Sequence, residues 1–125
     1  MAKNTPEHDL DLSFINEIAD GSDEFIIESI DMFLVQTPDL LESINKGIAE
    51  HNWPLVASAS HKLKPNLGFF GMKISQETFQ EIETMAKTGS PEPEKLSAKY
   101  RSIQPVLSDT LNELAKIREK KAATL

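Results

Sequence analysis

The apolar residues of this chain recur at the three- and four-residue spacing of amphipathic helices, and no convincing run has the two-residue alternation of a strand. This pattern predicts a short helix over residues 12–19, then helices from Asp23 toward His51, from Trp53 to Gly68–Gly71, from Ser75 to Gly89 and from about Glu94 onward. Pro38 predicts a kink or restart in the second helix, and Pro105 predicts a kink in the last. The expected fold class is all-α, an antiparallel four-helix bundle with a short N-terminal capping helix.

Several of these helices have recognisable start signals. Ser22 is expected to cap the second helix, because acidic residues follow it in the first turn, where negative charge is favourable. Asn52 is expected to cap the third helix, with Pro54 in its first turn. Ser75 is expected to open the fourth.

The length of 125 residues favours a single domain that can bury a substantial core. We find no internal repeat that would divide it further. We expect a flexible polar arm over residues 1–9, the helical bundle over 10–119 and a frayed charged tail over 120–125.

Charge and composition argue against several classes of function. The chain has 13 Lys and Arg against 20 Asp and Glu, a formal charge of −7, whereas binding of nucleic-acid phosphates needs clustered cations. It has no Cys, which excludes disulfides, thiolate metal sites and a Cys nucleophile. No apolar run approaches the ~20 residues of a membrane span, and the polar N-terminus lacks a signal-peptide pattern. We therefore expect a cytoplasmic monomer that binds neither nucleic acid nor membrane.

The chain has 3 histidines, which are the candidate nucleophiles or bases near neutral pH besides Ser and Thr. His8 lies in the polar arm, where we expect a solvated side chain. His51 ends the second helix, where a partly positive imidazole suits the helix dipole. Neither has the i, i+4 or Glu-x-x-His spacing of a helical metal site, so we expect no bound metal.

His61 differs from the other two histidines in its helical surroundings. With Leu63 at the centre of the core face, helical geometry puts His61 about 160° away, on the outward face. Apart from Lys64, the residues on this face are small or compact: Pro54, Ala57, Ser58, Pro65, Gly68 and Gly71. Such a cleared surface lets a second protein reach the imidazole, and Lys64, one turn on, can meet a charge attached to it. The alternative is a surface histidine that happens to lie beside small residues.

The segment Ser60–Gly71 resembles the signature of the histidine phosphotransfer (HPt) domain. In that signature, Leu at +2, Lys at +3 and small residues near +4, +7 and +10 follow the phosphorylated His, as Leu63, Lys64 and Gly68 follow His61 here. Further segments similar to the family are Asp11–Phe14, Gly21–Phe25, Phe33–Leu34 with Pro38 and Leu41, and His51–Trp53. The resemblance covers roughly residues 10 to 115.

Pro65 departs from the family pattern, which commonly has Gly or another small residue at +4. Proline lacks the N–H that would bond the carbonyl of His61, and its ring crowds that carbonyl. Pro65 is compact enough to leave the face open, yet we expect it to bend or loosen the helix beside the nucleophile.

The resemblance implies a phosphorelay intermediate. The neutral imidazole of His61 would attack the phosphoaspartate of a response-regulator receiver domain and later pass the phosphoryl group to another receiver. Lys64 would bond a phosphoryl oxygen, and Gly68 would permit close approach. The receiver would supply an acidic pocket and Mg²⁺, so the chain needs no cofactor of its own. A hybrid histidine kinase is a further expected partner, and the chain would be a stoichiometric carrier, not an enzyme.

Docking of a receiver needs a cleared or apolar surface beside the nucleophile. The expected docking residues are Ala57, Ser58, Pro65, Gly68, Gly71, Ile15 and Met32. Met32 lies roughly 140–160° from the main apolar stripe of its helix, which predicts an exposed side chain.

Two other interpretations compete with the phosphocarrier. The chain could be a helical adaptor that binds a partner without phosphorylation. It could also be the phosphoacceptor dimerisation segment of a sensor histidine kinase, whose histidine is likewise followed by a nearby Pro. In that segment an acidic residue directly follows the His, whereas Lys62 stands here, and the chain lacks a glycine-rich ATP-binding domain. Hydrolase or metalloenzyme activity has little support, because the sequence has no phosphate loop and no metal-ligand spacing.

Overall fold

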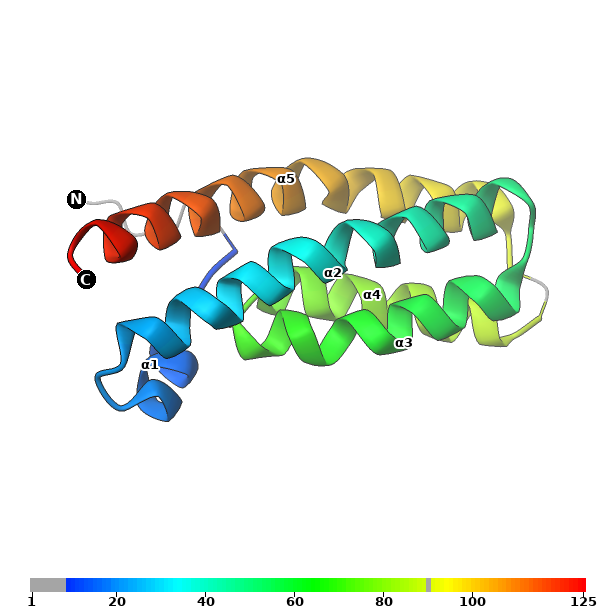
Figure 1. The fold of residues 1–125 in the computed structure, drawn as a ribbon. Helices are drawn as coiled ribbons and strands as arrows, with labels where there is room; N and C mark the ends of the chain where they lie inside the picture. Colours follow the sequence, from blue (N-terminus) through cyan, green and yellow to red (C-terminus); the bar gives the residue numbers. More distant parts are fainter. Residues whose placement is uncertain (1–8, 90) are drawn as a thin grey trace, which may run out of the picture.

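Five helices follow one another along the described chain: α1 (Ser13–Ala19), α2 (Asp23–Ala49), α3 (Trp53–Phe69), α4 (Lys73–Lys87) and α5 (Pro93–Ala123). The computed structural model describes residues 9–89 and 91–125. Helices α2 to α5 run alongside one another, each packed against two of the others, and α1 lies across the beginning of α2 (Figure 1). The predicted four-helix bundle with its short capping helix is confirmed. No helix in this part of the chain is long and apolar enough to cross a membrane.

The predicted caps of α2 and α3 are present. The Ser22 hydroxyl accepts a hydrogen bond from the Phe25 N–H at 3.1 Å, and the Asn52 side-chain oxygen accepts one from the Leu55 N–H at 3.3 Å. Each cap satisfies one backbone donor that the first helical turn leaves without an intrahelical partner. These two boundaries are therefore encoded locally.

The start of α4 is capped from a distant part of the sequence. The helix begins at Lys73, two residues before the predicted Ser75, and Ser75 itself is buried. The Asp9 carboxylate accepts hydrogen bonds from the N–H groups of Ile74 at 3.0 Å and Ser75 at 2.7 Å. A local N-cap was predicted because the sequence alone could not reveal a hydrogen-bond acceptor 65 residues away.

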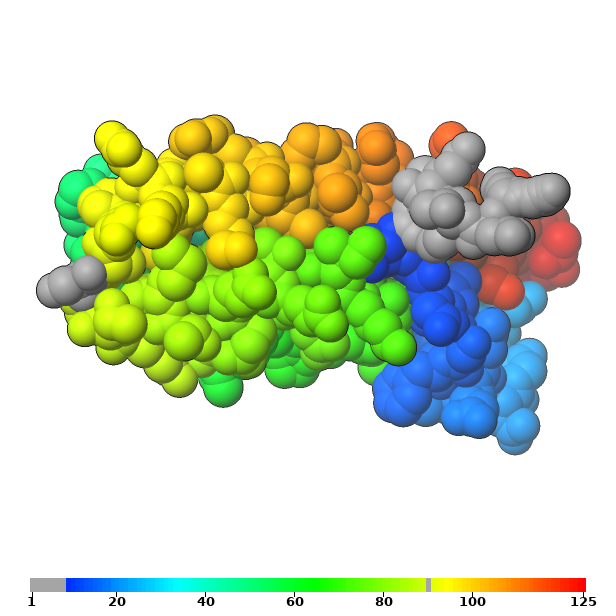
Figure 2. Space-filling model, turned by 180° about the vertical axis from the view of Figure 1, so that it is seen from behind, coloured from blue at the N-terminus to red at the C-terminus, as the bar shows by residue number. Residues whose placement is uncertain are grey.

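Asp9 belongs to the bundle. We had expected it in the flexible arm, and that prediction was wrong for this residue. Its backbone N–H donates to the Thr110 hydroxyl of α5 at 3.2 Å, and the residue is buried. The first described residues, blue in Figure 2, lie against the green start of α4. The remainder of the predicted arm, residues 1–8 with His8, lies outside the described residues.

We expect Asp9→Ala to lower the free energy of unfolding by about 1–2 kcal/mol, because two N–H groups at the start of α4 lose their acceptor. Urea denaturation followed by circular dichroism measures this loss. Asp109→Ala, at an exposed position of α5, is the control and should change stability by less than about 0.5 kcal/mol. Equal effects of the two substitutions would contradict the capping role of Asp9.

Pro38 and Pro105 do not end their helices. Pro38 lies inside α2 and Pro105 inside α5, and Thr37, directly before Pro38, is buried within α2. Each proline removes one backbone hydrogen bond, but both rings lie on exposed positions, and packing on the opposite face keeps the helix continuous.

The end of α5 is helical where we expected a frayed tail from residue 120. The helix continues to Ala123, and the Lys121 ammonium lies 3.0 Å from the Asp23 carboxylate at the start of α2. The Arg118 guanidinium similarly contacts the Asp31 carboxylate at 2.9 Å. These contacts between elements far apart in the sequence hold the last turns against α2.

Candidate functional site

His61 projects from the middle of α3 into solvent. Its side chain is 69% exposed, whereas Leu63 is fully buried at the centre of the core face. The helix therefore has the orientation that its periodicity predicts. Pro65 stands on an exposed position inside α3 and does not end the helix, which continues to Phe69.

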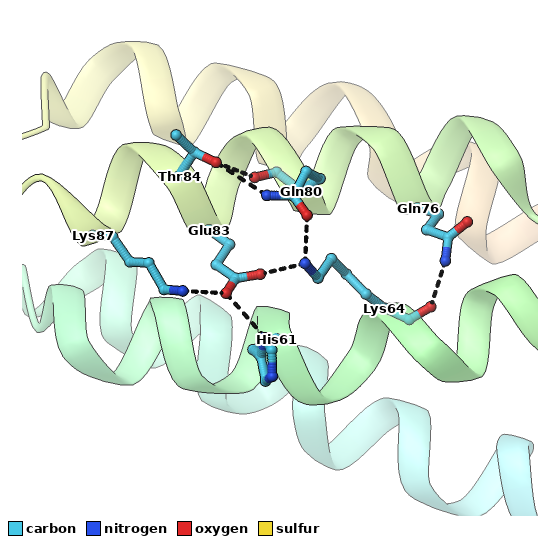
Figure 3. A network of polar contacts seen from close by, with 7 residues as sticks. All are labelled: His61, Lys64, Gln76, Gln80, Glu83, Thr84 and Lys87. Carbon is cyan, nitrogen blue, oxygen red and sulfur yellow. Dashed lines mark hydrogen bonds and ion pairs between the residues drawn. The ribbon is translucent and has the colours of Figure 1, made fainter.

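The His61 ring is held by a carboxylate from the neighbouring helix α4 (Figure 3). His61 Nδ1 lies 3.0 Å from Glu83 Oε2. The same carboxylate receives the Lys64 ammonium at 2.7 Å on Oε1 and the Lys87 ammonium at 2.9 Å on Oε2. Glu83 is 2% exposed, so one buried anion joins a nucleophile candidate to two cations.

Sequence reasoning did not identify Glu83 or Lys87. The available signal was an acidic residue inside the buried stripe of α4, between Ile82 and Ala86. A carboxylate is rarely buried unless it is paired, so an acid at a core position indicates a built polar site.

The pKa of the Glu83 carboxyl is about 2, against an ordinary value of 4.5. Burial by itself acts to raise the pKa of Glu83. Hydrogen bonds from Lys64 and Lys87 and the positive charges of both residues outweigh burial and lower it. The Glu83 carboxyl is therefore an anion at any pH well above 2.

This low pKa makes the stability of the fold depend on acid. Because the pKa of Glu83 is depressed in the folded state, its contribution is fully present above about pH 4.5 and is lost as the pH falls toward 2. We expect the excess stability of wild type over Glu83→Gln to shrink by on the order of 2–3 kcal/mol over this interval. Urea denaturation at several pH values measures it.

Glu81→Gln is the matched control for the acid dependence, since Glu81 lies on the same helix, is exposed and pairs with Lys99. Its stability difference from wild type should change little with pH. A difference between wild type and Glu83→Gln that is the same at pH 2 and pH 6 would contradict the assignment of the low pKa.

The Glu83 contact decides which ring nitrogen of His61 is available. An ionised carboxylate only accepts hydrogen bonds, so we assign the ring proton to Nδ1, which donates it to Glu83 Oε2. In the neutral ring, Nε2 then carries the lone pair. A histidine with one nitrogen engaged by a buried anion and the other free is suited to nucleophilic attack through Nε2.

Lys64 lies beside this nucleophile but is engaged. Besides Glu83, its ammonium contacts the side-chain oxygen of Gln80, and the side chain is 18% exposed. A groove of about 460 Å³ runs past these groups, lined by His61, Lys64, Pro65, Gln76, Glu77 and Gln80. The groove leaves room for a group attached to His61.

Gly68 has a packing role that the sequence did not predict. The Gln76 amide reaches from α4 to the Lys64 carbonyl, to which it donates a hydrogen bond at 3.2 Å. A Cβ on Gly68 would lie 2.6 Å from Gln76 Nε2, so the glycine leaves space for this bond. Gly68 thereby helps to fasten α3 to α4 beside Pro65.

Two of the expected docking residues are buried, and a third lies in a turn. Ile15 is fully buried, because α1 turns Ile15 and Ala19 toward the bundle. Ala57 is also buried, since α3 packs against both α2 and α4 and its buried arc is wider than one face. Gly71 lies beyond the end of α3, where helical angles do not apply, and its φ of +66° serves a tight turn against Asp11.

Three of the other expected docking residues are accessible. Ser58 and Pro65 are exposed, and Met32 is 60% exposed. The exposed Phe14 ring packs edge-on against Phe69 with centroids 5.8 Å apart, a pair that sequence reasoning missed. Between α2 and α3 lies a groove of about 260 Å³ lined by Ser29, Met32, Phe33, Gln36, Asn66, Phe69 and Phe70.

The other histidine in the described structure has a different setting. His51 lies in the connection between α2 and α3 with φ +54°, and its ring stacks on Trp53 at 5.2 Å. Within residues 9–89 and 91–125, no group of three or more His, Asp or Glu side chains could hold a metal ion.

A helical bundle that presents one histidine in solvent, backed by a buried carboxylate and a lysine one turn away, defines a histidine-presenting domain. The profile of the Hpt domain family matches residues 28–117, and the chain belongs to this family. The resemblance seen in the sequence is thus confirmed. Hpt domains are phosphocarrier modules of two-component phosphorelays, and they interact with the receiver domains of response regulators and hybrid kinases.

One solved structure is similar over 94% of both chains, with 23% sequence identity and a TM-score of 0.57. It is the crystal structure of the HPT domain from an Hpt sensor hybrid histidine kinase from Shewanella. At this identity the likeness concerns the fold. No curated protein matches the chain.

Proposed function

We propose that His61 accepts a phosphoryl group from the phosphoaspartate of a receiver domain and passes it to another receiver. The observation that carries this proposal is the contact between His61 Nδ1 and the buried Glu83 carboxylate, which leaves Nε2 free on an exposed ring. Nε2 forms a bond to phosphorus as the bond between phosphorus and the aspartate oxygen breaks in line. Donation to the second receiver reverses these steps.

The surrounding charges supply what this reaction needs from the chain. Phosphoryl transfer depends on positioning and on neutralising the oxygens of the group. Lys64, held 2.7 Å from Glu83 and next to the groove, can turn from the carboxylate to a phosphoryl oxygen. The receiver would bring the Mg²⁺ and its acidic pocket. The chain returns to its starting state only after donation, so it is a stoichiometric carrier and not an enzyme.

We further propose that the receiver docks across α2 and α3. Exposed apolar side chains favour protein contacts, and Met32 stands beside the groove between these helices. Ser58 and Pro65 are exposed and compact, so they leave the His61 ring accessible to a docked protein. Phe14 and Phe69 extend the apolar area toward α1.

Two observations weigh against the competing interpretations. An adaptor without phosphorylation has no use for a buried carboxylate aimed at an exposed histidine, which costs desolvation energy. A dimerisation segment completes its bundle with a second chain, whereas α2 to α5 already form a closed set of neighbours within one chain. We therefore propose a monomer, in the cytoplasmic location expected from the sequence.

The test is incubation of the protein with a phosphorylated receiver domain and Mg²⁺, read by intact mass. The proposal expects the gain of one phosphoryl group that is lost in acid and that a fresh receiver removes. No gain from any of several receivers, with the fold intact by circular dichroism, would favour the adaptor.

A further inference from the structure

Phosphoryl transfer through His61 changes the charge of its imidazole ring, and the buried Glu83 carboxylate is in contact with that ring. The neutral ring donates its Nδ1 proton to Glu83 at 3.0 Å. When Nε2 bonds to phosphorus, the ring keeps this proton and becomes positive. Glu83 is then an anion in hydrogen-bond contact with a cation.

We propose that Glu83 keeps the proton on Nδ1 of His61 through both halves of the transfer, so that the phosphoryl group arrives and leaves without any proton moving. This inference rests on the function proposed above. It makes Glu83 a positioning residue that acts through the ring, because it touches neither phosphorus nor Nε2.

The retained proton matters most when the phosphoryl group leaves. As the carboxylate of the second receiver bonds to phosphorus, the electron pair of the bond between Nε2 and phosphorus returns to Nε2. With the proton on Nδ1, the leaving group is a neutral imidazole. Without it, an imidazolate anion would have to leave, which is a far poorer leaving group.

The charges around Glu83 allow it to remain an anion throughout. Lys64 of α3 and Lys87 of α4 both contact it, and Lys87 remains at 2.9 Å from Oε2 if Lys64 turns to the phosphoryl group. From α5, Lys99 pairs with Glu81 instead. Asp39 of α2 lines a separate groove together with Lys62. Lys87 thus pairs the buried carboxylate while Lys64 is engaged elsewhere.

A neutral amide in place of Glu83 separates positioning from charge. In Glu83→Gln, the side-chain oxygen can still accept the Nδ1 hydrogen bond but does not attract the positive ring. An opposite charge at this distance shifts a proton equilibrium by about 1–3 pH units. The substitution should therefore leave the ring in place and let the phosphorylated ring lose its proton at a lower pH.

The experiment measures the rate of transfer from the phosphorylated protein to a fresh receiver across neutral and alkaline pH. The rate of Glu83→Gln divided by that of wild type cancels the receiver's own pH dependence. We expect this ratio to fall with rising pH, with a midpoint about 1–3 units below that of the wild-type decline. Glu81→Gln, the same substitution on the same helix, should give a ratio near one at every pH.

A second measurement needs no variant. Nitrogen-15 NMR of the phosphorylated wild-type protein reports the Nδ1 proton directly, and the same protein in urea provides the reference without Glu83 in place. We expect the folded protein to keep the proton to a pH about 1–3 units higher. Loss at the same pH in both, or a rate ratio for Glu83→Gln that is flat with pH, would overturn the inference.

These outcomes are distinct from failure of the proposed function. If wild type and Glu83→Gln both take up the phosphoryl group and their ratio is flat, only the proton-holding role of Glu83 is wrong. If wild type accepts no phosphoryl group, the carrier function is wrong and this inference with it.

Discussion

His61→Gln is expected to accept no phosphoryl group from a phosphorylated receiver, whereas the wild-type protein gains one. A glutamine amide has no nucleophilic lone pair comparable to Nε2 of a neutral imidazole, so the loss should be complete. Because the His61 side chain is 69% exposed, the substitution should leave the core and the circular dichroism spectrum unchanged. Intact mass before and after acid treatment is the measurement.

His51→Asn is the matched control for the nucleophile. His51 lies in the connection between α2 and α3, and Asn tolerates its positive φ of 54°. This variant should gain the phosphoryl group as wild type does. A gain in His61→Gln would show that another side chain is the nucleophile.

Gly71→Ala is expected to lose about 3–5 kcal/mol of stability, a large part of the total for a domain of this size. A Cβ at this position would lie 2.2 Å from the Asp11 carbonyl oxygen, and φ is +66°. The Asp11 N–H also donates to the Phe70 carbonyl at 3.1 Å, so the N-terminal segment cannot move away without losing that bond. Urea denaturation measures the loss.

Gly21→Ala is the control that separates the cost of backbone strain from the cost of the Gly71 Cβ contact with Asp11. Gly21 also has a positive φ, +88°, but a Cβ there would have nothing within 4 Å. We expect a loss of about 1–2 kcal/mol from strain alone. Equal losses for the two glycines would mean that the contact with Asp11 is relieved at no cost, which would return Gly71 to the list of docking candidates.

The sequence predicted those features whose causes lie within one or two helical turns. Ser22 and Asn52 cap α2 and α3 through residues three positions on, so both starts could be recognised. The periodicity around Leu63 placed His61 outward because a helix fixes the angle between neighbours. The position of Lys64 one turn from His61 follows from the same helical spacing.

Features that depend on two helices meeting were not predictable in this way. Glu83 contacts His61, which lies 22 residues away on α3, and the cap of α4 comes from Asp9, 65 residues from Ile74. Ala57 and Ile15 were misplaced because their burial depends on which helices flank α3 and α1.

The sequence by itself determined the helices, the bundle and the exposed histidine, because hydrophobic periodicity and capping are local properties of the chain. Only the tertiary structure decided which side chains contact that histidine. Packing α4 against α3 brings the Glu83 carboxylate to Nδ1 of His61 and to the Lys64 ammonium, and Lys87, one turn further on in α4, adds a second cation. A buried charge is stable only with such partners, and the two that come from α3, His61 and Lys64, can be known only from the way the helices pack.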